Sequence, residues 1–166
     1  MSETAYIGLG GNLGDREALL GAAVRGLAVQ PGVELRVCSS LYETAAVGPP
    51  QPDYLNAVVV VQTSLEPVEL LECLRSLERA AGRERRERWG PRTLDADLLL
   101  YGERVVEEPG LMVPHPELHR RRFVLEPLAE VAPWAVHPVL ARTVDELLLQ
   151  LPPEGVVRYA PPPSFP

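Results

Sequence analysis

The 166-residue chain is predicted to form an α+β domain of the ferredoxin-like βαββαβ type, with an antiparallel sheet, helices packed on it and a C-terminal elaboration. The observation behind this is the order of the expected elements: strand, helix, two strands, helix, strand. Right-handed crossovers in that order place both helices on one face of the sheet. A run of four valines, 58–61, indicates a central strand that is buried on both faces.

The first half of this core is expected within the first 42 residues. A strand covers 5–9, and after a glycine-rich turn a helix begins near Asp15 and stops at 31–32, where proline and glycine interrupt it. Alternating apolar residues then predict one continuous strand from Val33 to about Tyr42.

The second half follows a proline-containing loop at 44–53. A strand is expected over 54–62, and the next helix has Pro67 near its first position and stops at Gly82. The last strand of the core is expected over 94–101. The buried face of the second helix is predicted to carry Val68, Leu71, Leu74 and Leu77.

Residues beyond 101 are less regular, and we expect them to elaborate the core, so that 1–166 forms a single domain. The pattern indicates a hairpin through 104–113 and a short helix near 116–121. Two further helical segments are expected, 123–131 and 143–151. The proline-rich tail, 160–166, is expected to be frayed.

Composition excludes several classes of protein. The net charge of −7 argues against nucleic-acid binding driven by overall charge. All 16 basic residues are arginine, so a P-loop and Schiff-base chemistry are both excluded. Cys38 and Cys73 lack metal-ligand spacing and are expected to be reduced cysteines of a cytoplasmic protein. No apolar run approaches 18 residues, so we expect no membrane span.

Asp95 and Asp97 form the strongest candidate site. They lie two residues apart in a predicted strand, so they share one face, with Cα atoms roughly 6–7 Å apart. Paired carboxylates suit a hard cation such as Mg²⁺. Five arginines within 83–92 precede them, and guanidinium groups pair bidentately with phosphate oxygens, which suggests a polyphosphate substrate. The alternative is a strand edge with two solvated acids.

Tyr54 and Asn56 share one face of the central strand. An aromatic ring beside an amide can stack a flat heterocycle and bind its hydrogen-bonding edge. The alternative is a core tyrosine with a capping asparagine. The glycine-rich turn, 8–14, fails the dinucleotide pattern because Leu13 occupies the place of its third glycine. It is instead expected to let a ligand approach the backbone, or to be a structural turn only. His115 lies in a turn fixed by prolines, which suits a phosphate contact.

Four segments together resemble the 6-hydroxymethyl-7,8-dihydropterin pyrophosphokinase family of folate biosynthesis: 5–14 (AYIGLGGNLG), 53–57 (DYLNA), 87–97 (ERWGPRTLDAD) and 113–123 (VPHPELHRRRF). The resemblance extends over about residues 5–134. It implies transfer of a pyrophosphoryl group from ATP to the hydroxymethyl oxygen of the pterin, with release of AMP. It also implies a cytoplasmic, monomeric enzyme that binds neither nucleic acid nor membrane.

The resemblance also implies roles for individual residues. Asp95 and Asp97 would be the ligands of two Mg²⁺ ions. The pterin would be bound by Thr44, backbone at Val47, Tyr54, Asn56 and Phe123. ATP would be bound by Glu78, Arg83, Arg85, Arg88, Trp89, Arg92, Leu98, His115 and Arg121. The catalytic set would be Arg83, Arg92, Asp95, Asp97 and His115.

This chain departs from the family pattern in two loops, 44–56 and 83–89, each of which is one residue shorter than in common members. Gly110, Met112 and Pro116 also stand where other residue types are frequent. The alternative function is a non-catalytic nucleotide-binding regulatory module, because the ferredoxin-like fold hosts many functions. An RNA-binding module is disfavoured by the net charge of −7.

Overall fold

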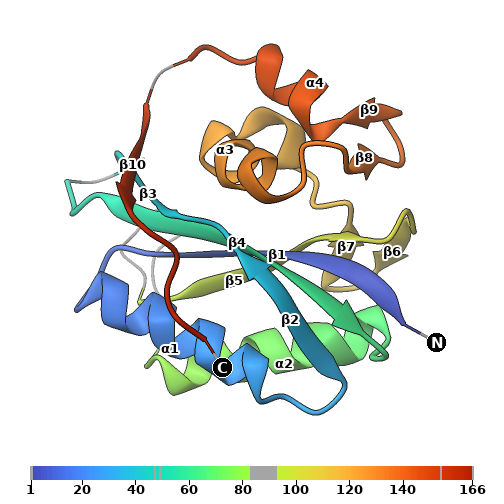
Figure 1. Ribbon diagram of the computed structural model, residues 1–166, viewed down its shortest axis with the longest axis horizontal. Helices are drawn as coiled ribbons and strands as arrows, with labels where there is room; N and C mark the ends of the chain where they lie inside the picture. The colour runs from blue at the N-terminus through green and yellow to red at the C-terminus, as the bar shows by residue number, and fades with distance from the viewer. Residues whose placement is uncertain (1, 47, 49, 83–92, 154, 166) are drawn as a thin grey trace.

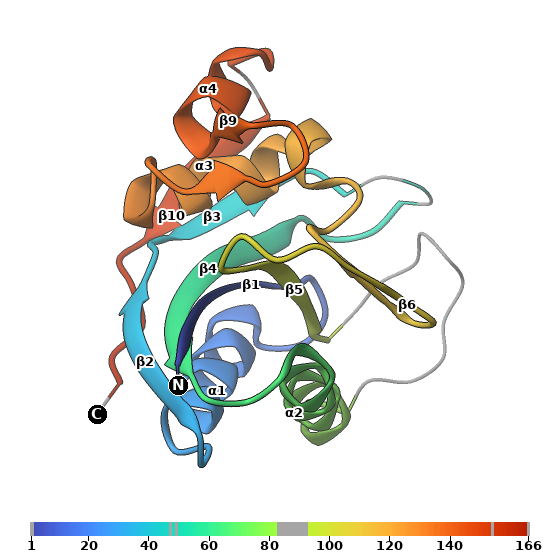
Figure 2. The same cartoon turned by 90° about the vertical axis from the view of Figure 1, so that its right-hand side faces the viewer.

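The computed structural model describes residues 2–46, 48, 50–82, 93–153 and 155–165. Within these ranges an antiparallel sheet of six strands separates two layers of helices (Figures 1 and 2). The sheet order is β10-β3-β4-β1-β5, and β2 also pairs with β4. The elements are β1 (Glu3–Gly11), α1 (Arg16–Ala28), β2 (Val33–Cys38), β3 (Leu41–Thr44), β4 (Tyr54–Thr63), α2 (Pro67–Ala80), β5 (Asp95–Tyr101), β6 (Val106–Glu108), β7 (Leu111–Val113), the 3₁₀ helix η1 (Leu118–Arg120), α3 (Arg122–Val131), β8 (Val136–His137), β9 (Arg142–Thr143), α4 (Val144–Leu149) and β10 (Val156–Ala160).

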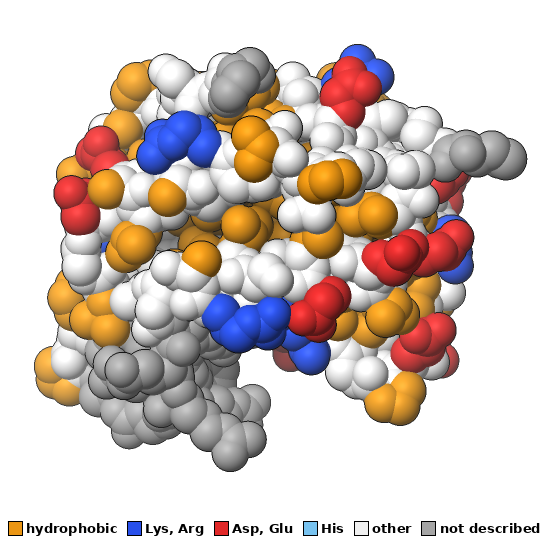
Figure 3. All heavy atoms as spheres, turned by 90° about the horizontal axis from the view of Figure 1, so that it is seen from below, with side chains coloured by type: hydrophobic (Ala, Val, Ile, Leu, Met, Phe, Trp, Pro, Cys, Tyr) orange, Lys and Arg blue, Asp and Glu red, His pale blue; other side chains and the backbone are white. Residues whose placement is uncertain are grey.

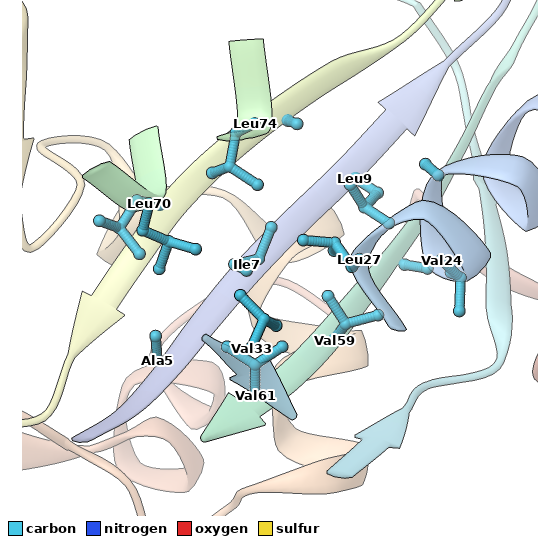
Figure 4. Close-up of a cluster of buried hydrophobic side chains, with 14 of the residues drawn as sticks. Ala5, Ile7, Leu9, Val24, Leu27, Val33, Val59, Val61, Leu70 and Leu74 are labelled. Carbon is cyan, nitrogen blue, oxygen red and sulfur yellow. The ribbon is translucent and has the colours of Figure 1, made fainter. Parts of the chain in front are cut away.

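The order of the first elements confirms the predicted ferredoxin-like α+β core. Helices α1 and α2 lie together under one face of the sheet, as expected from right-handed crossovers, whereas α3 and α4 cover the other face (Figure 1). The sheet therefore has a hydrophobic core on each side. On the α1/α2 side, Ile7 and Leu9 of β1 point toward Leu27 of α1 (Figure 4). On the other side, Val58 and Leu99 pack with the apolar face of α3.

Local signals explain several boundaries. The Asp15 carboxylate accepts a hydrogen bond from the backbone N–H of Ala18 at 3.2 Å, which caps α1 where the sequence predicted its start. Pro67 occupies the first turn of α2. Gly82 follows that helix with φ +78°, a conformation that favours glycine. The valine run of β4 is buried on both faces, with Val59 and Val61 fully buried.

The predicted continuous strand from Val33 to Tyr42 is wrong, because the strand breaks at Ser39 and Ser40. Both serines are fully buried, so their polar groups need partners within the protein. The Ser39 Oγ accepts from the N–H of Val58 at 2.9 Å, and the N–H of Ser40 donates to the carboxylate of Glu130 at 2.9 Å. The second bond comes from a distant helix, so the alternation of residues in the strand does not reveal it.

The predicted buried face of α2 is also partly wrong. Val68 is 53% exposed. Leu70, which is not part of the predicted face, is fully buried together with Leu74. Leu71 and Leu77 are only partly buried at the margin of the core. The buried residues of α2 are Pro67, Leu70 and Leu74, which lie three and four residues apart. This spacing places them on one side of the helix, the side that faces the sheet.

The C-terminal region confirms the expected hairpin as β6 and β7 and the expected helices as η1, α3 and α4. The sequence missed β10, which pairs with β3 at the edge of the sheet. The prediction of a frayed tail was also wrong, since Ala160 and Phe165 are partly buried and pack against the hydrophobic core on the α1/α2 side of the sheet. Tertiary contacts therefore hold a segment whose prolines suggested no regular structure.

The outer surface agrees with the composition. Acidic and basic side chains are interspersed with apolar ones on the face seen from below, the side of α1 and α2 (Figure 3). Among the described residues, no helix is both long enough and apolar enough to cross a bilayer.

The corrected face of α2 gives a stability prediction. Leu74→Ala removes a fully buried side chain and should lower the free energy of unfolding by about 2–5 kcal/mol. Val68→Ala, on the exposed face of the same helix, should change it by less than about 0.5 kcal/mol. Urea unfolding followed by circular dichroism measures both, and equal losses would contradict the orientation of α2.

Candidate active site

A cavity of about 620 Å³ lies between the sheet and the beginning of α3. Strands β1, β3, β4 and β5 form its floor, and the segment through η1 and the first turn of α3 forms its opposite wall. Its lining includes Gly8, Gly10, Thr44, Ala45, Tyr54, Asn56, Val58, Asp95, Asp97, Leu99, Glu117, Arg121, Phe123 and Val124. Residues far apart in the sequence therefore meet in one place because four strands are hydrogen-bonded side by side.

The central feature of the floor is the pair of glycines in β1. Gly10 pairs with Asn56 of β4 on one side and with Asp95 of β5 on the other. A Cβ added at Gly10 would lie 2.7 Å from the Oδ1 of Asn56, which is closer than real Cβ contacts come. Gly8 pairs with Asp97 in the same way, two residues along the strand. The glycines thus keep the floor open between an amide and two carboxylates.

The β4 side of the cavity carries the residues suited to a flat heterocycle. Asn56 is 7% exposed, and its Nδ2 donates to the Thr44 Oγ1 at 3.1 Å. Thr44 is the cross-strand partner of Tyr54. Tyr54 and Phe123 are half-buried and both line the cavity, one from the sheet and the other from α3. The predicted aromatic pair is therefore brought to opposite walls of the same cavity.

The β5 side carries the two carboxylates, as the alternation of a strand requires. Asp95 is half-buried, Asp97 is exposed, and both line the cavity, while Ala96 between them is buried on the other face. The backbone N–H of Ala96 donates to the Glu78 Oε2 at 2.9 Å. Glu78 thus lies behind β5, where it fixes the segment that presents the acids.

The described residues contain no group of three or more His, Cys, Asp or Glu side chains arranged to hold a metal ion. Two carboxylates on one face of a strand nevertheless fit Mg²⁺, which binds proteins through one or two carboxylates and takes its other ligands from water and substrate phosphates. The donor set is therefore suited to a cation that arrives with a polyphosphate.

The three consecutive arginines at 120–122, from the end of η1 to the first residue of α3, point in three different directions. Arg121 lines the cavity, and its guanidinium lies over the Phe123 ring, 5.6 Å from the ring centroid. Arg120 is exposed and pairs with Glu117 at 3.6 Å. Arg122 bonds the Pro152 carbonyl at 2.9 Å, away from the cavity. One arginine of the three is thus placed to meet a ligand there.

His115 is bonded to β5 two residues beyond Asp97 and is not among the residues that line the cavity. Its backbone N–H donates to the Leu99 carbonyl at 2.9 Å, which ties the turn to β5. Its Nδ1 accepts from the backbone N–H of Glu117 at 3.1 Å, so the neutral ring carries its proton on Nε2. Burial lowers the pKa of His115, while the charge of Asp97 opposes that shift and the charge of Arg121 adds to it. The imidazole is therefore a neutral Nε2–H donor at neutral pH.

Of the remaining predicted residues, the structure describes Leu98, which does not line the cavity. Leu98 is 4% exposed and belongs to the core on the α1/α2 side. Val47, Arg83, Arg85, Arg88, Trp89 and Arg92 lie outside the described residues. Sequence reasoning did not select Glu117 or Val124, which line the cavity wall. No spacing rule points to them, because their position depends on how η1 and α3 dock onto the sheet.

Fold and site together define a class: a ferredoxin-like α+β enzyme with an open cavity, an aromatic pair at one end and paired carboxylates at the other. Residues 6–133 match the family model described as 7,8-dihydro-6-hydroxymethylpterin-pyrophosphokinase. The chain therefore belongs to this family of pyrophosphokinases of folate biosynthesis.

Two curated relatives carry the name 2-amino-4-hydroxy-6-hydroxymethyldihydropteridine pyrophosphokinase. The one from Synechocystis is 47% identical over 157 residues, covering 95% of this chain and 80% of its own length. The one from Bacillus subtilis is 48% identical over 132 residues, covering 79% of each chain. Both relatives are matched over more than two thirds of their length, in agreement with the family assignment.

A solved structure supports the fold. A Plasmodium falciparum HPPK-DHPS structure described as wild type with STZ-DHP superposes with a TM-score of 0.70 at 15% sequence identity. The match covers 90% of this chain and 43% of that one, so this chain spans less than half of that protein's length. At this identity the likeness shows a shared fold.

The floor of the cavity gives a binding prediction. Gly10→Ala should displace the Asn56 amide and weaken binding of 6-hydroxymethyl-7,8-dihydropterin about tenfold, because a lost hydrogen bond that leaves a buried group unpaired costs about 1–3 kcal/mol. Isothermal titration calorimetry measures the affinity. Gly21→Ala is the control, since its added methyl meets only the flexible end of Arg25 within α1. Unchanged affinity in Gly10→Ala would show that Asn56 does not contact the pterin.

Proposed function

We propose that the chain transfers a pyrophosphoryl group from MgATP to the hydroxymethyl oxygen of 6-hydroxymethyl-7,8-dihydropterin and releases AMP. The observation that carries this proposal is the single cavity with Tyr54 and Phe123 on opposite walls and Asp95 and Asp97 on its floor. A flat heterocycle between the rings would direct its hydroxymethyl group along the floor toward the carboxylates. The proposed enzyme is a cytoplasmic monomer, as the family resemblance implies.

The pterin end is proposed to work by stacking and by edge recognition. Tyr54 and Phe123 stack the ring, which excludes water from both its faces. Asn56 binds the donor–acceptor edge, and its bond to Thr44 at 3.1 Å fixes which way the amide faces. A predicted backbone contact at Val47 completes this set.

Asp95 and Asp97 are proposed to hold Mg²⁺, two ions in all, with the triphosphate supplying further oxygen ligands. When bound, the metal neutralises phosphate charge and lowers the pKa of a coordinated hydroxyl. The protein contributes two carboxylates on one strand face, held by the Glu78 bond to Ala96 and by pairing with β1. This support keeps the carboxylate oxygens in place when the substrates arrive.

The reaction forms a bond from the hydroxymethyl oxygen to the β-phosphorus and breaks the bond between that phosphorus and the oxygen that leaves with AMP. The pterin hydroxyl loses its proton to solvent, so the products are the pyrophosphorylated pterin, AMP and one proton. Arg121 lines the cavity, where its positive charge is proposed to bind the phosphates. The neutral His115 is proposed to donate from Nε2–H to a phosphate oxygen. The further nucleotide contacts proposed are Glu78 and five residues outside the described ranges: Arg83, Arg85, Arg88, Trp89 and Arg92.

The direct test mixes the protein, MgATP and 6-hydroxymethyl-7,8-dihydropterin and quantifies AMP by chromatography, with a control that lacks pterin. Pterin-dependent AMP in step with pyrophosphorylated pterin is the expected result. ADP as the product would contradict attack at the β-phosphorus. MgATP binding without turnover would favour the regulatory nucleotide-binding module.

Removing a carboxylate should stop turnover. Asp97→Ala should lower kcat at least about 100-fold with the fold intact, because a metal ligand supplies several kcal/mol of transition-state stabilisation. Glu107→Ala, which removes an exposed acid from β6, is the control for loss of negative charge. Activity of Asp97→Ala within a few-fold of wild type would contradict the proposal that Asp97 binds Mg²⁺.

The aromatic wall should be specific for the pterin. Phe123→Ala should raise the pterin dissociation constant about tenfold, because stacking adds about 0.5–1.5 kcal/mol to the area that the ring buries. Affinity for MgATP, measured in the same calorimeter, should change little. Phe165→Ala removes the other phenylalanine, which packs against the core, and should leave pterin affinity unchanged. If Phe123→Ala lowered the affinities for pterin and MgATP equally, Phe123 would have a structural role in the core.

A further inference from the structure

We propose that Glu130 of α3 is a positioning residue that fixes the distance between Phe123 and the sheet, and with it the width of the pterin slot. The role in pterin binding rests on the proposed function. The structural part, that Glu130 determines how α3 sits on the sheet, stands on the contacts alone.

The Glu130 carboxylate binds three donors from one place in the sheet. Its Oε1 accepts from the Ser40 N–H at 2.9 Å and from the Tyr42 hydroxyl at 2.8 Å. Its Oε2 accepts from the Ser40 hydroxyl at 2.9 Å. Ser40 lies at the break between β2 and β3, so Glu130 satisfies the backbone N–H that the break removes from the strand ladder.

The same helix carries Phe123 seven residues earlier. Seven residues are close to two helical turns, so Phe123 and Glu130 lie on one face of α3 about 10 Å apart along its axis. One end of that face thus meets the cavity and the other end is bonded to β3. A shift or tilt of α3 on the sheet would move both.

The anchor point in the sheet is aligned with the cavity floor. Tyr42 of β3 is the cross-strand partner of Asn56 of β4, and Asn56 is in turn the partner of Gly10 of β1. Gly10 is also the partner of Asp95 of β5. This row crosses four strands and ends at a proposed metal ligand. Bonding Tyr42 to Glu130 therefore places Phe123 relative to the amide and the carboxylates at once.

The other contacts that α3 makes with the sheet are apolar packing contacts. Leu125 and Leu128 pack on Val58 and Leu99 through apolar surfaces, which have no directional preference. Arg122 bonds Glu126 within the helix and the Pro152 carbonyl in the segment after α4. In the part of the chain that the structure describes, the side-chain hydrogen bonds from α3 to the sheet are those of Glu130.

The chemistry of the partners keeps these bonds intact. Burial raises the pKa of Tyr42 well above its usual range, and the hydrogen bond to Glu130 adds to the shift. The phenol therefore stays protonated well above neutral pH and remains a hydrogen-bond donor to Glu130. Cys38, next to the break, has its pKa raised to about 12 by burial and by the Glu130 charge, so it adds no second negative charge there.

The test compares Glu130→Ala with Glu130→Gln in the full chain. Glu130→Ala removes all three bonds and should raise the pterin dissociation constant and KM about tenfold, with MgATP affinity within about twofold of wild type. Glu130→Gln should stay within about threefold of wild type. Its amide oxygen accepts from Ser40 N–H and Tyr42, and the Ser40 hydroxyl can turn to accept from the amide N–H. Glu126→Ala is the control, because Glu126 bonds Arg122 on the same helix.

A second measurement needs no ligand. The chain has two phenylalanines, so fluorophenylalanine labelling gives two ¹⁹F resonances, one from Phe123 and one from Phe165 as an internal reference. In Glu130→Ala the Phe123 resonance should shift or broaden while the Phe165 resonance stays in place. In Glu130→Gln and Glu126→Ala both should match wild type.

Equal loss of pterin and MgATP affinity in Glu130→Ala, with a lower Tm, would overturn the proposal in favour of a general structural role. An unchanged Phe123 resonance in Glu130→Ala would also overturn it. A wild-type chain that makes no AMP from pterin and ATP would refute the proposed function. The ¹⁹F spectra would still decide whether Glu130 positions α3.

Discussion

The site depends on the pairing of β1 with β4 on one side and β5 on the other. Antiparallel pairing places directly opposite residues on the same face of a sheet, so one hydrogen-bond register brings Asn56 and Asp95 to the two sides of Gly10. A slip of one residue in either pair would turn the amide or the carboxylates into the opposite core. The hydrophobic contacts of Ile7 and Leu9 on that opposite face therefore secure the register, and with it the active-site geometry.

The two faces of the sheet have different tasks. The α1/α2 side is a closed apolar core, whereas on the α3/α4 side the apolar packing ends at Val58 and Leu99 and leaves the cavity between the sheet and α3. Its polar groups come from strands on a rigid frame, and its cationic wall comes from Arg121 at the start of α3. In a chain with a net charge of −7, such local placement matters more than overall charge for binding an anionic substrate.

The sequence was informative where neighbours along the chain decide the structure. Capping at Asp15, the stop at Gly82, the buried valines of β4 and the shared face of Asp95 and Asp97 follow from local rules, and all are present. The failures are long-range. The break at Ser40 is stabilised by Glu130, 90 residues away, and β10 forms because β3 offers a free edge. At the site, the same limit separates the acids and Asn56, which strand alternation identifies, from Glu117 and Val124, which only the docking of α3 brings to the cavity.

Strand β5 lies at an edge of the main sheet, where exposed backbone groups usually invite pairing with another molecule. Here the outward N–H of Ala96 is taken by the Glu78 carboxylate, and the Leu99 carbonyl by the N–H of His115. The residues that hold the acid-bearing strand in place thus also close it to strand addition. Loss of either bond would therefore do more than loosen the strand that carries the acids, because it would free a backbone group at the edge of β5 to pair with another chain.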